Sequence, residues 1–434
     1  MSATDLHGLT LTGASRVAAD LYEQSVAAYQ CYAGDPITPL ETAIADSPAF
    51  VMAHVMKAYL HLIGSNAEAF AVGVQAFETV RRLPATDREQ GHVAAVGSLI
   101  AGELRAAQRF LEDVAIAHPR DVLALQVGQT IDFLLGDSRM LRDRIGRALP
   151  SWTADMPGFH AVQGCLAFGL EETGLYDRAE AAGRLALDLE PRNGWAKHAV
   201  AHVMEMQDRR AEGVAFMRAD IPNWTENSFF AIHNWWHLGL FHLGLGEVDT
   251  VLELFDGPIF GSRSNLALDM LDAAAMLWRL ELMGVDVGAR WGAIADLYET
   301  QPRGQYAFDD THAMLAFTAA CRRDQADALI AAQHAALSGP GDNAMFVREV
   351  GLPVVRAISA FGDGKYRECT DLLRGVRSGS ARFGGSHAQR DLIDLTLIEA
   401  ARRGGDTGLE TALLAERANA REQAAARARL LAAE

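Results

Sequence analysis

Helix-breaking residues recur along this chain at nearly constant intervals, and this spacing restricts its possible folds more than any other feature. The intervals alternate between 34 and 38 residues, with turn residues at Gly102, Gly136, Gly174, Asp208 and Gly246. Alanine- and leucine-rich stretches fill the intervals, whereas the alternating valine, isoleucine and threonine of β-strands are almost absent. The pattern therefore predicts an all-α chain of repeated helical hairpins, with similar turns within 321–329 and 361–373.

One repeat can be read in detail in the segment GCLAFGLEETGLYDRAEAAGRLALDLEP. Ala167 is small enough for two helices to approach closely, Gly174 makes the turn, and Pro191 stops the second helix. Ala179 and Ala186 are expected to pack between the two helices. Residue types and spacing resemble the tetratricopeptide repeat, whose period is about 34 residues.

Hairpins of this kind bury their apolar faces only against neighbouring hairpins, so we expect a continuous array. The prediction is a single α-solenoid over residues 1–434, with repeats from about 15 to 405. The segment 407–434 is rich in alanine, leucine, arginine and glutamate, and is expected to form a helix that caps the last repeat.

Composition and charge narrow the classes of partner and the location. The net charge of −17 argues against nucleic acid or an anionic membrane as the main partner. No apolar run reaches membrane-spanning length, and no secretory signal is visible at the start of the sequence. The four cysteines are far apart and form no CxxC pair, which is typical of reduced thiols in a cytoplasmic protein. The sequence allows a homo-oligomer but does not require one.

Two pairs of histidines carry the strongest functional signal. His198 and His202 form one pair, and His233 and His237 form the other. A spacing of four residues places both rings of a pair on one helical face, one turn apart. Glu205 lies on the same face as the first pair. If the two helices are neighbours, four imidazoles and a carboxylate converge.

The turn register assigns these side chains to the concave surface of the solenoid. The first helix of a tetratricopeptide hairpin turns its second, fifth, ninth and twelfth positions toward that surface. In one repeat these four positions hold Trp195, His198, His202 and Glu205. In the next repeat His233 and Trp236 hold the first two, and His237 is adjacent to Trp236. Earlier repeats place His92, Gln126 and Thr130 on the same predicted surface.

A second group of candidates lies nearer the C-terminus. Asp310 and His312 stand at the start of a predicted helix, where a carboxylate also serves as an ordinary cap. His387 and Arg390 occupy the first turn of another. Arg390 could hold a ligand carboxylate through its planar guanidinium, or pair with Asp394 one turn later. The candidate substrate-binding residues are therefore Trp195, Trp236, Asp310, His312, His387 and Arg390.

A series of blocks between about residues 20 and 415 resembles the tetratricopeptide repeat protein 38 family. In order, the blocks are GHVAAVGSLIAGELRAA, HPRDVLALQ, FGLEETGLYDRAE, WAKHAVAHVMEM, HNWWHLGLFHL, LDMLDAAAMLWRLEL and GGSHAQRDLIDLTLIEAA. The resemblance implies an all-α tetratricopeptide solenoid and no particular activity. The two blocks that contain the histidine pairs are among those that carry it.

Three functions remain open for the histidine-rich surface. In the first, it binds a small or peptide-like ligand, with His198, His202, Glu205, His233 and His237 as catalytic candidates for hydrolysis or proton transfer. Glu205 would orient or deprotonate one imidazole, and another would act as general base. No G-x-S-x-G nucleophile motif is present, so the sequence does not support acyl transfer. In the second, the four histidines hold a transition metal such as zinc. In the third, the chain is a non-enzymatic scaffold for a protein or peptide partner. The sequence leaves open whether the chain is an enzyme.

Overall fold

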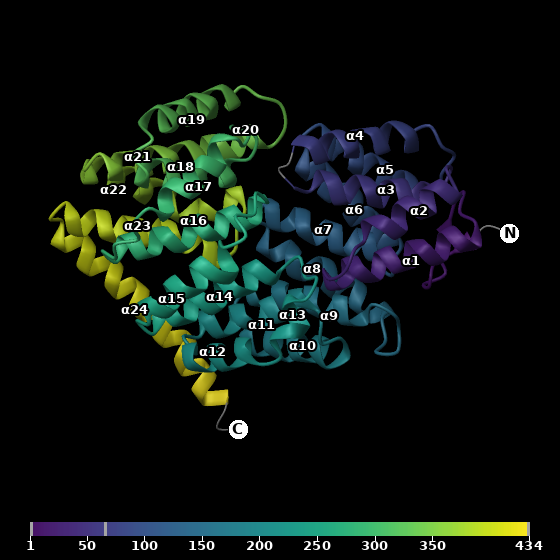
Figure 1. The fold of residues 1–434 in the computed structure, drawn as a ribbon. Coiled ribbons are helices and arrows are strands. Elements are labelled where there is room, and N and C mark those ends of the chain that lie inside the picture. Colours follow the sequence, from purple (N-terminus) through teal and green to yellow (C-terminus); the bar gives the residue numbers. More distant parts are fainter. Residues whose placement is uncertain (1–2, 65–66, 432–434) are drawn as a thin grey trace. The chain divides into compact units, whose positions relative to one another are not determined.

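The computed structural model describes residues 3–64 and 67–431, and the regular secondary structure of these residues is almost entirely helical (Figure 1). The exception is a short antiparallel pair near the N-terminus, β1 (Ala3–Thr4) and β2 (Thr10–Leu11). Within the described ranges, no helix combines the length and the apolar composition that crossing a bilayer requires. The fold is all-α and built from tetratricopeptide-type helical hairpins, which confirms the predicted fold class.

The chain divides into two compact units. The first comprises Met1–Val200 and Asp220–Ala231. Its helices are α1 (Arg16–Cys31), α2 (Ile37–Asp46), α3 (Val51–Leu62), α4 (Ala67–Val80), α5 (Asp87–Ile100), α6 (Leu104–Ala117), α7 (Val122–Leu134), α8 (Ser138–Ala148), the short 3₁₀ turn η1 (Leu149–Ser151), α9 (Phe159–Glu171), α10 (Tyr176–Leu189) and α13 (Ile221–Thr225). Helix α11 (Gly194–Met206) is continuous through the boundary between Val200 and Ala201.

The second unit comprises Ala201–Ala219 and Ile232–Glu434. Its elements are α12 (Arg210–Arg218), α14 (Ala231–Gly244), α15 (Val248–Leu254), η2 (Phe255–Ile259), α16 (Ala267–Leu282), α17 (Arg290–Glu299), α18 (Ala307–Ala319), α19 (Arg323–Ala336), α20 (Asn343–Phe346), η3 (Val347–Gly351), α21 (Leu352–Gly362), α22 (Tyr366–Val376), η4 (Arg377–Phe383), α23 (His387–Arg403) and α24 (Thr407–Leu431). Segments η2 and η3 are π-helical turns, and η4 is a 3₁₀ segment.

The five predicted turn residues all adopt the left-handed conformation that ends the first helix of a hairpin. Gly102, Gly136, Gly174 and Gly246 have φ values between 64° and 79°, and Asp208 has a φ of 59°. Glycine enters this region at little cost because it has no Cβ, and aspartate tolerates it better than most residues. The prediction of periodic helical hairpins is confirmed at each of these positions.

Turns of the same kind continue toward the C-terminus. Cys321 and Gly364 lie in the two segments where the sequence predicts them, with φ values of 55° and 73°. Gly284 and Gly405 also have positive φ values, between α16 and α17 and between α23 and α24. Neither turn was predicted, although Gly284 lies 38 residues after Gly246 and so continues the spacing of the earlier turns.

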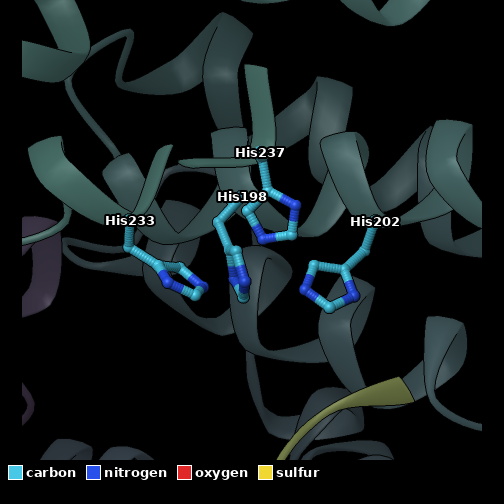
Figure 2. Close-up of side chains that lie close together, drawn as sticks. All are labelled: His198, His202, His233 and His237. Atoms are coloured by element: carbon cyan, nitrogen blue, oxygen red, sulfur yellow. The ribbon is translucent and has the colours of Figure 1, made fainter. Parts of the chain in front are cut away.

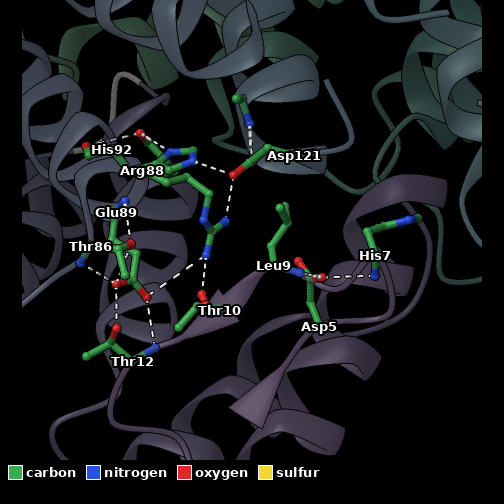
Figure 3. Close-up of polar contacts among 12 residues, drawn as sticks. Asp5, His7, Leu9, Thr10, Thr12, Thr86, Arg88, Glu89, His92 and Asp121 are labelled. Carbon is green, nitrogen blue, oxygen red and sulfur yellow. Dashed lines mark hydrogen bonds and ion pairs between the residues drawn. The ribbon is translucent and has the colours of Figure 1, made fainter. Parts of the chain in front are cut away.

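A buried polar network ties the N-terminal strand pair to helix α5 of the first unit (Figure 3). Arg88 donates from Nη1 to Asp121 Oδ2 and from Nη2 to the carbonyl oxygen of Thr10, each at 2.6 Å. Glu89 accepts hydrogen bonds from the main-chain nitrogen of Thr12 at 2.9 Å and from its hydroxyl at 2.7 Å. The N-terminal residues are therefore part of the packed structure of this unit.

His92 belongs to this network and does not lie on a surface. Its side chain has an exposed fraction of 0%. Its Nδ1 lies 3.0 Å from the hydroxyl of Tyr59, and its Nε2 lies 3.1 Å from Asp121 Oδ2. Burial acts to raise the pKa of Asp121, but His92 and Arg88 outweigh it and hold that pKa below its ordinary value. The predicted place of His92 on the concave surface was wrong, because its ring is used for hydrogen bonding inside the unit.

Candidate functional site

The structure brings the two histidine pairs together (Figure 2). One ring nitrogen from each of His198, His202, His233 and His237 lies within 4.8 Å of the other three. The first pair comes from the continuous helix α11 and the second from α14, so each helix contributes two rings one turn apart. The exposed fractions of the four side chains lie between 0% and 4%. We call these residues the histidine cluster.

His237 contacts two other members of the cluster. Its ring centroid is 4.5 Å from that of His202 and 4.9 Å from that of His233. Burial lowers the pKa of His237 well below its ordinary value, and the neighbouring His202, His233 and Arg279 lower it further. Its imidazole is therefore neutral at physiological pH, which is the form that binds a metal ion or accepts a proton.

Asp272 of helix α16 orients the ring of His233. The two carboxylate oxygens lie 2.8 and 3.0 Å from His233 Nδ1. An ionised carboxylate only accepts hydrogen bonds, so Nδ1 donates and Nε2 presents its lone pair. Burial raises the pKa of Asp272, whereas His233 and Arg279 favour its ionised form. A carboxylate bound to the far nitrogen of a histidine is the usual outer partner of a metal-ligating imidazole.

Glu205 was the carboxylate that the sequence assigned to an imidazole. It stands on α11 three residues after His202 and is half-buried. Its charge acts on the pKa of Arg279 and of Arg417. Its contact with an imidazole stays a prediction, whereas Asp272, which the histidine motifs do not include, forms a hydrogen bond with His233.

Trp236 is a packing platform for the cluster and is completely buried. Its indole stacks on the ring of His233, with centroids 5.4 Å apart and planes inclined by 14°. The guanidinium carbon of Arg279 lies 5.4 Å from the centroid of the same indole. Trp236 therefore fixes the position of His233, and its indole is not exposed on a concave surface as the sequence predicted.

Trp195 is only half-buried and belongs to an aromatic group of the first unit. Its ring centroid lies 4.6 Å from that of Phe168, 5.1 Å from that of Phe230 and 4.8 Å from that of His198. Its contact with the imidazole of His198 places it beside a member of the cluster. The apolar surface that the sequence expected from Trp195 is thus provided by several rings together.

Asp310 holds a loop and a helix of the second unit together. Its carboxylate accepts hydrogen bonds from the main-chain nitrogen of Gly304, at 2.9 and 3.2 Å, and from the side-chain amide of Gln333. Burial raises the pKa of Asp310 to about 7. These contacts join the loop before α18 to helix α19, while a contact with a ligand stays a prediction.

His312 lies two residues further along α18 and has an exposed fraction of 1%. Its Nδ1 donates to the carbonyl oxygen of Phe308 at 2.9 Å. Its Nε2 has no hydrogen-bond partner among the residues that the structure describes. Burial lowers the pKa of His312 to about 3, and the charge of Arg279 contributes to this shift.

The remaining candidates lie at the start of α23. His387 is its first residue and is half-buried, and the guanidinium of Arg390 donates to the carbonyl oxygen of Gly385. Asp394, the alternative partner that spacing suggested for Arg390, forms its ion pair with Arg377 at 2.9 Å. Arg390 therefore stabilises the turn at Gly384 and Gly385, which precedes α23.

Arg279 of α16 connects the two groups of candidates, and the sequence analysis missed it. It lies over Trp236 on one side and donates from Nη2 to the carbonyl oxygen of Ala388 in α23. A signal was present in the sequence, because Asp272 and Arg279 are charged residues within the otherwise apolar stretch LDMLDAAAMLWRL. Charged side chains in such a stretch are rarely buried without a specific partner.

No family model matches this chain. Among solved structures, it is similar to a Rap protein complexed with competence and sporulation factor, at 10% identity and a TM-score of 0.46, covering 86% of this chain and 98% of that one. It is also similar to a human IFIT1 dimer with m7Gppp-AAAA, at 13% identity and a TM-score of 0.42, covering 94% of each chain. Likenesses this distant say nothing about the site, so its chemistry has to be judged from its own residues.

Proposed function

We propose that this chain binds a transition-metal ion through the histidine cluster and acts on a small ligand there, by hydrolysis or proton transfer. The observation that carries the proposal is the convergence of four buried imidazoles, with one nitrogen of each within 4.8 Å of the rest. Imidazole nitrogen is a preferred ligand of zinc, copper, nickel and iron. A bound ion of this kind polarises a carbonyl group or lowers the pKa of a coordinated water.

The chain's own residues prepare this chemistry. Asp272 fixes the tautomer of His233 so that Nε2 faces away from the carboxylate. Trp236 holds the ring from one face, and burial keeps His237 neutral. The cluster is enclosed by protein, which strengthens electrostatic interactions inside it. The concave groove remains a prediction, and the buried rings favour a small ligand over a long peptide.

The broader context of the chain forms part of the same proposal. We assign it to the tetratricopeptide repeat protein 38 family, because the blocks WAKHAVAHVMEM and HNWWHLGLFHL contain the whole cluster. We also propose a cytoplasmic location and a partner that is neither nucleic acid nor a membrane. The support is the net charge of −17 and four cysteines that form no disulfide.

Metal binding can be tested directly on the untagged full-length protein. After dialysis against a chelator, titration with Zn²⁺ and Co²⁺ should show about one equivalent bound per chain, by calorimetry and elemental analysis. His202→Gln and His237→Gln should each weaken binding by at least about tenfold, because each removes a nitrogen ligand. The Co²⁺ form should show visible absorption typical of nitrogen ligands.

His242→Gln is the matched control. His242 is a buried histidine of the same helix α14, but its nitrogens face Glu247 and Arg218, outside the cluster. This variant should bind metal like the unmodified protein. Absence of stoichiometric metal, with cluster variants that lose only stability, would show that the histidines are packing residues. The alternative function, a scaffold for a protein or peptide partner, would then remain.

A further inference from the structure

We propose that Arg279 anchors an anionic oxygen group of the ligand, a carboxylate or a phosphate, in a subsite formed with Trp236 and His312. The inference rests on the proposed function, since it names the class of ligand on which the histidine cluster acts. All three residues belong to the second unit, on helices α16, α14 and α18. Neither the repeat pattern nor the family resemblance assigns a role to Arg279.

The first observation is that Arg279 is a buried cation that forms no ion pair within the described residues, although the charges of Asp391, Glu205 and Asp272 act on it. Its side chain has an exposed fraction of 5%, and no carboxylate of the described residues forms an ion pair with it. Its hydrogen-bond partners are two main-chain carbonyl oxygens, of Ala275 and Ala388. The acid closest along its own helix toward the cluster, Asp272, is engaged by His233. A buried guanidinium in this state is costly for the fold, and an anionic ligand would remove that cost.

The second observation is the position of this cation relative to the histidine cluster. The guanidinium carbon of Arg279 lies 5.4 Å from the ring centroid of Trp236, and that centroid lies 5.4 Å from the ring centroid of His233. Trp236 also touches His237, with centroids 4.9 Å apart. Arg279 and two cluster histidines therefore contact the same indole, so a ligand group held by Arg279 lies close to the imidazoles.

The third observation is that two buried polar atoms lack partners, one on Trp236, which Arg279 contacts, and one on His312 of α18, a helix that packs against α16. His312 donates from Nδ1 to a carbonyl oxygen, so its Nε2 is an acceptor, and this atom has no partner within the described residues. The indole nitrogen of Trp236 is a buried donor that likewise finds no acceptor in the described part of the chain. Buried polar atoms normally find a partner, so each is a signal for a ligand group.

Together these atoms define the chemistry of the ligand. The guanidinium and the indole N–H both donate, which suits negatively charged oxygens. The free nitrogen of His312 accepts, which suits a hydroxyl, amine or amide hydrogen near those oxygens. The ligand is therefore a small acid whose carboxylate or phosphate carries a neighbouring hydrogen-bond donor.

Anion binding should be measured on the chelator-treated full-length protein, so that it does not depend on a metal ion. Inorganic phosphate and succinate serve as probes, at an ionic strength held constant with chloride. Each probe that fits the subsite should raise the unfolding midpoint saturably, and the more effective one identifies the anionic group. Arg279→Met should weaken binding at least about tenfold, and His312→Phe should weaken it less.

The stability of Arg279→Met without anion separates this role from a structural one. Removing a buried charge that has no ion-pair partner should leave the unfolding midpoint close to that of the unmodified protein or higher. The matched control is Arg144→Met, because Arg144 is buried but paired with Asp132 at 2.7 and 2.9 Å, and this variant should be strongly destabilised. Arg279→Lys keeps the positive charge but loses the planar guanidinium with its paired N–H donors. This variant should fold and should bind phosphate more weakly.

Anion binding that is absent, or equal in Arg279→Met and the unmodified protein, would overturn this inference even if the cluster binds metal. Conversely, saturable binding lost in Arg279→Met, in a protein that takes up no metal, would support the subsite and refute the metal proposal. The two failures are thus distinguishable.

Discussion

At the scale of single residues, the site depends on partners that lie outside the histidine motifs. Spacing of four residues was enough to place two imidazoles on one face of α11 and two on one face of α14. It could not reveal Asp272, because this residue lies on the next helix, α16, which carries neither histidine pair. It also could not show which nitrogen of His233 carries the proton, since that depends on a contact between helices.

Asp272→Asn should weaken metal binding by about 10- to 100-fold, because the neutral amide polarises the imidazole of His233 less than a carboxylate does. The fold should be retained, since Asn still accepts the hydrogen bond from Nδ1. Calorimetric titration with Zn²⁺ would measure the change. Asp269→Asn, one turn earlier on α16, is the control and should bind normally. Equal affinities for all three proteins would contradict the role of Asp272.

Asp310 should make stability depend on pH, because burial raises its pKa from 3.8 to about 7. Between these two pH values the folded protein holds a proton on Asp310 that the unfolded chain releases. The stability that this proton provides is fully present below pH 3.8 and is lost as the pH rises toward 7. The loss amounts to at most about 4 kcal/mol. Asp310→Asn resembles the protonated form and should gain stability relative to the unmodified protein between pH 4 and pH 8.

Urea unfolding at several pH values would measure this gain for Asp310→Asn. Asp324→Asn, an exposed acid in the first turn of α19, is the control, and its difference from the unmodified protein should stay nearly constant. If the difference in unfolding free energy between Asp310→Asn and the unmodified protein were also independent of pH, burial would not raise the pKa of the Asp310 carboxyl group.

At the scale of helices, the repeat pattern was highly predictive because each turn imposes its own conformational requirement. Gly174 and Asp208 illustrate this, since both have the positive φ that ends a first helix. The terminal helix α24 begins at Thr407, where composition places it, and Arg417 in it pairs with Asp391 of α23 at 2.7 Å. Continuity of the array over residues 15–405 and the capping role of α24 stay predictions.

Two glycines at matched positions, each third from the end of its helix, should respond oppositely to alanine. A Cβ on Gly169 of α9 would lie 2.5 Å from main-chain atoms of Leu141 and Arg142, which cannot move aside. Gly169→Ala should therefore lose about 1–3 kcal/mol of unfolding free energy. A Cβ on Gly146 of α8 would meet nothing within 4 Å, so Gly146→Ala should gain up to about 1 kcal/mol.

Chemical denaturation of both glycine variants would test this packing. Stabilisation by alanine at Gly169 would mean that α8 and α9 are less closely packed than the structure shows. The comparison isolates packing from helix propensity, since both substitutions replace glycine by alanine near a helix C-terminus.

At the scale of the whole molecule, metal binding should be coupled to folding. An ion that binds only the folded chain adds about 2.7 kcal/mol when its free concentration is 100 times the dissociation constant. Zn²⁺ added to chelator-treated protein should therefore raise the unfolding midpoint. The shift should fade as the pH falls, because protons compete with the ion for imidazole nitrogens.

Scanning calorimetry with and without Zn²⁺ would record this coupling. His237→Gln should lose the shift and His242→Gln should keep it, since both lie on α14 but only His237 belongs to the cluster. The coupling would be refuted if Zn²⁺, Co²⁺, Ni²⁺ and Cu²⁺ all left the midpoint unchanged at neutral pH.

The left-handed turn at Cys321 has a practical consequence for fluorescence work. Cys321 is exposed, whereas Cys31, Cys165 and Cys369 are buried, with pKa values that burial raises to about 11, 12 and 12. A thiolate is the form that attacks a maleimide, so a dye will attach at the exposed Cys321 without any prior engineering of the chain. The label then sits at the end of the helix that carries His312, where it can report on that helix as anions bind.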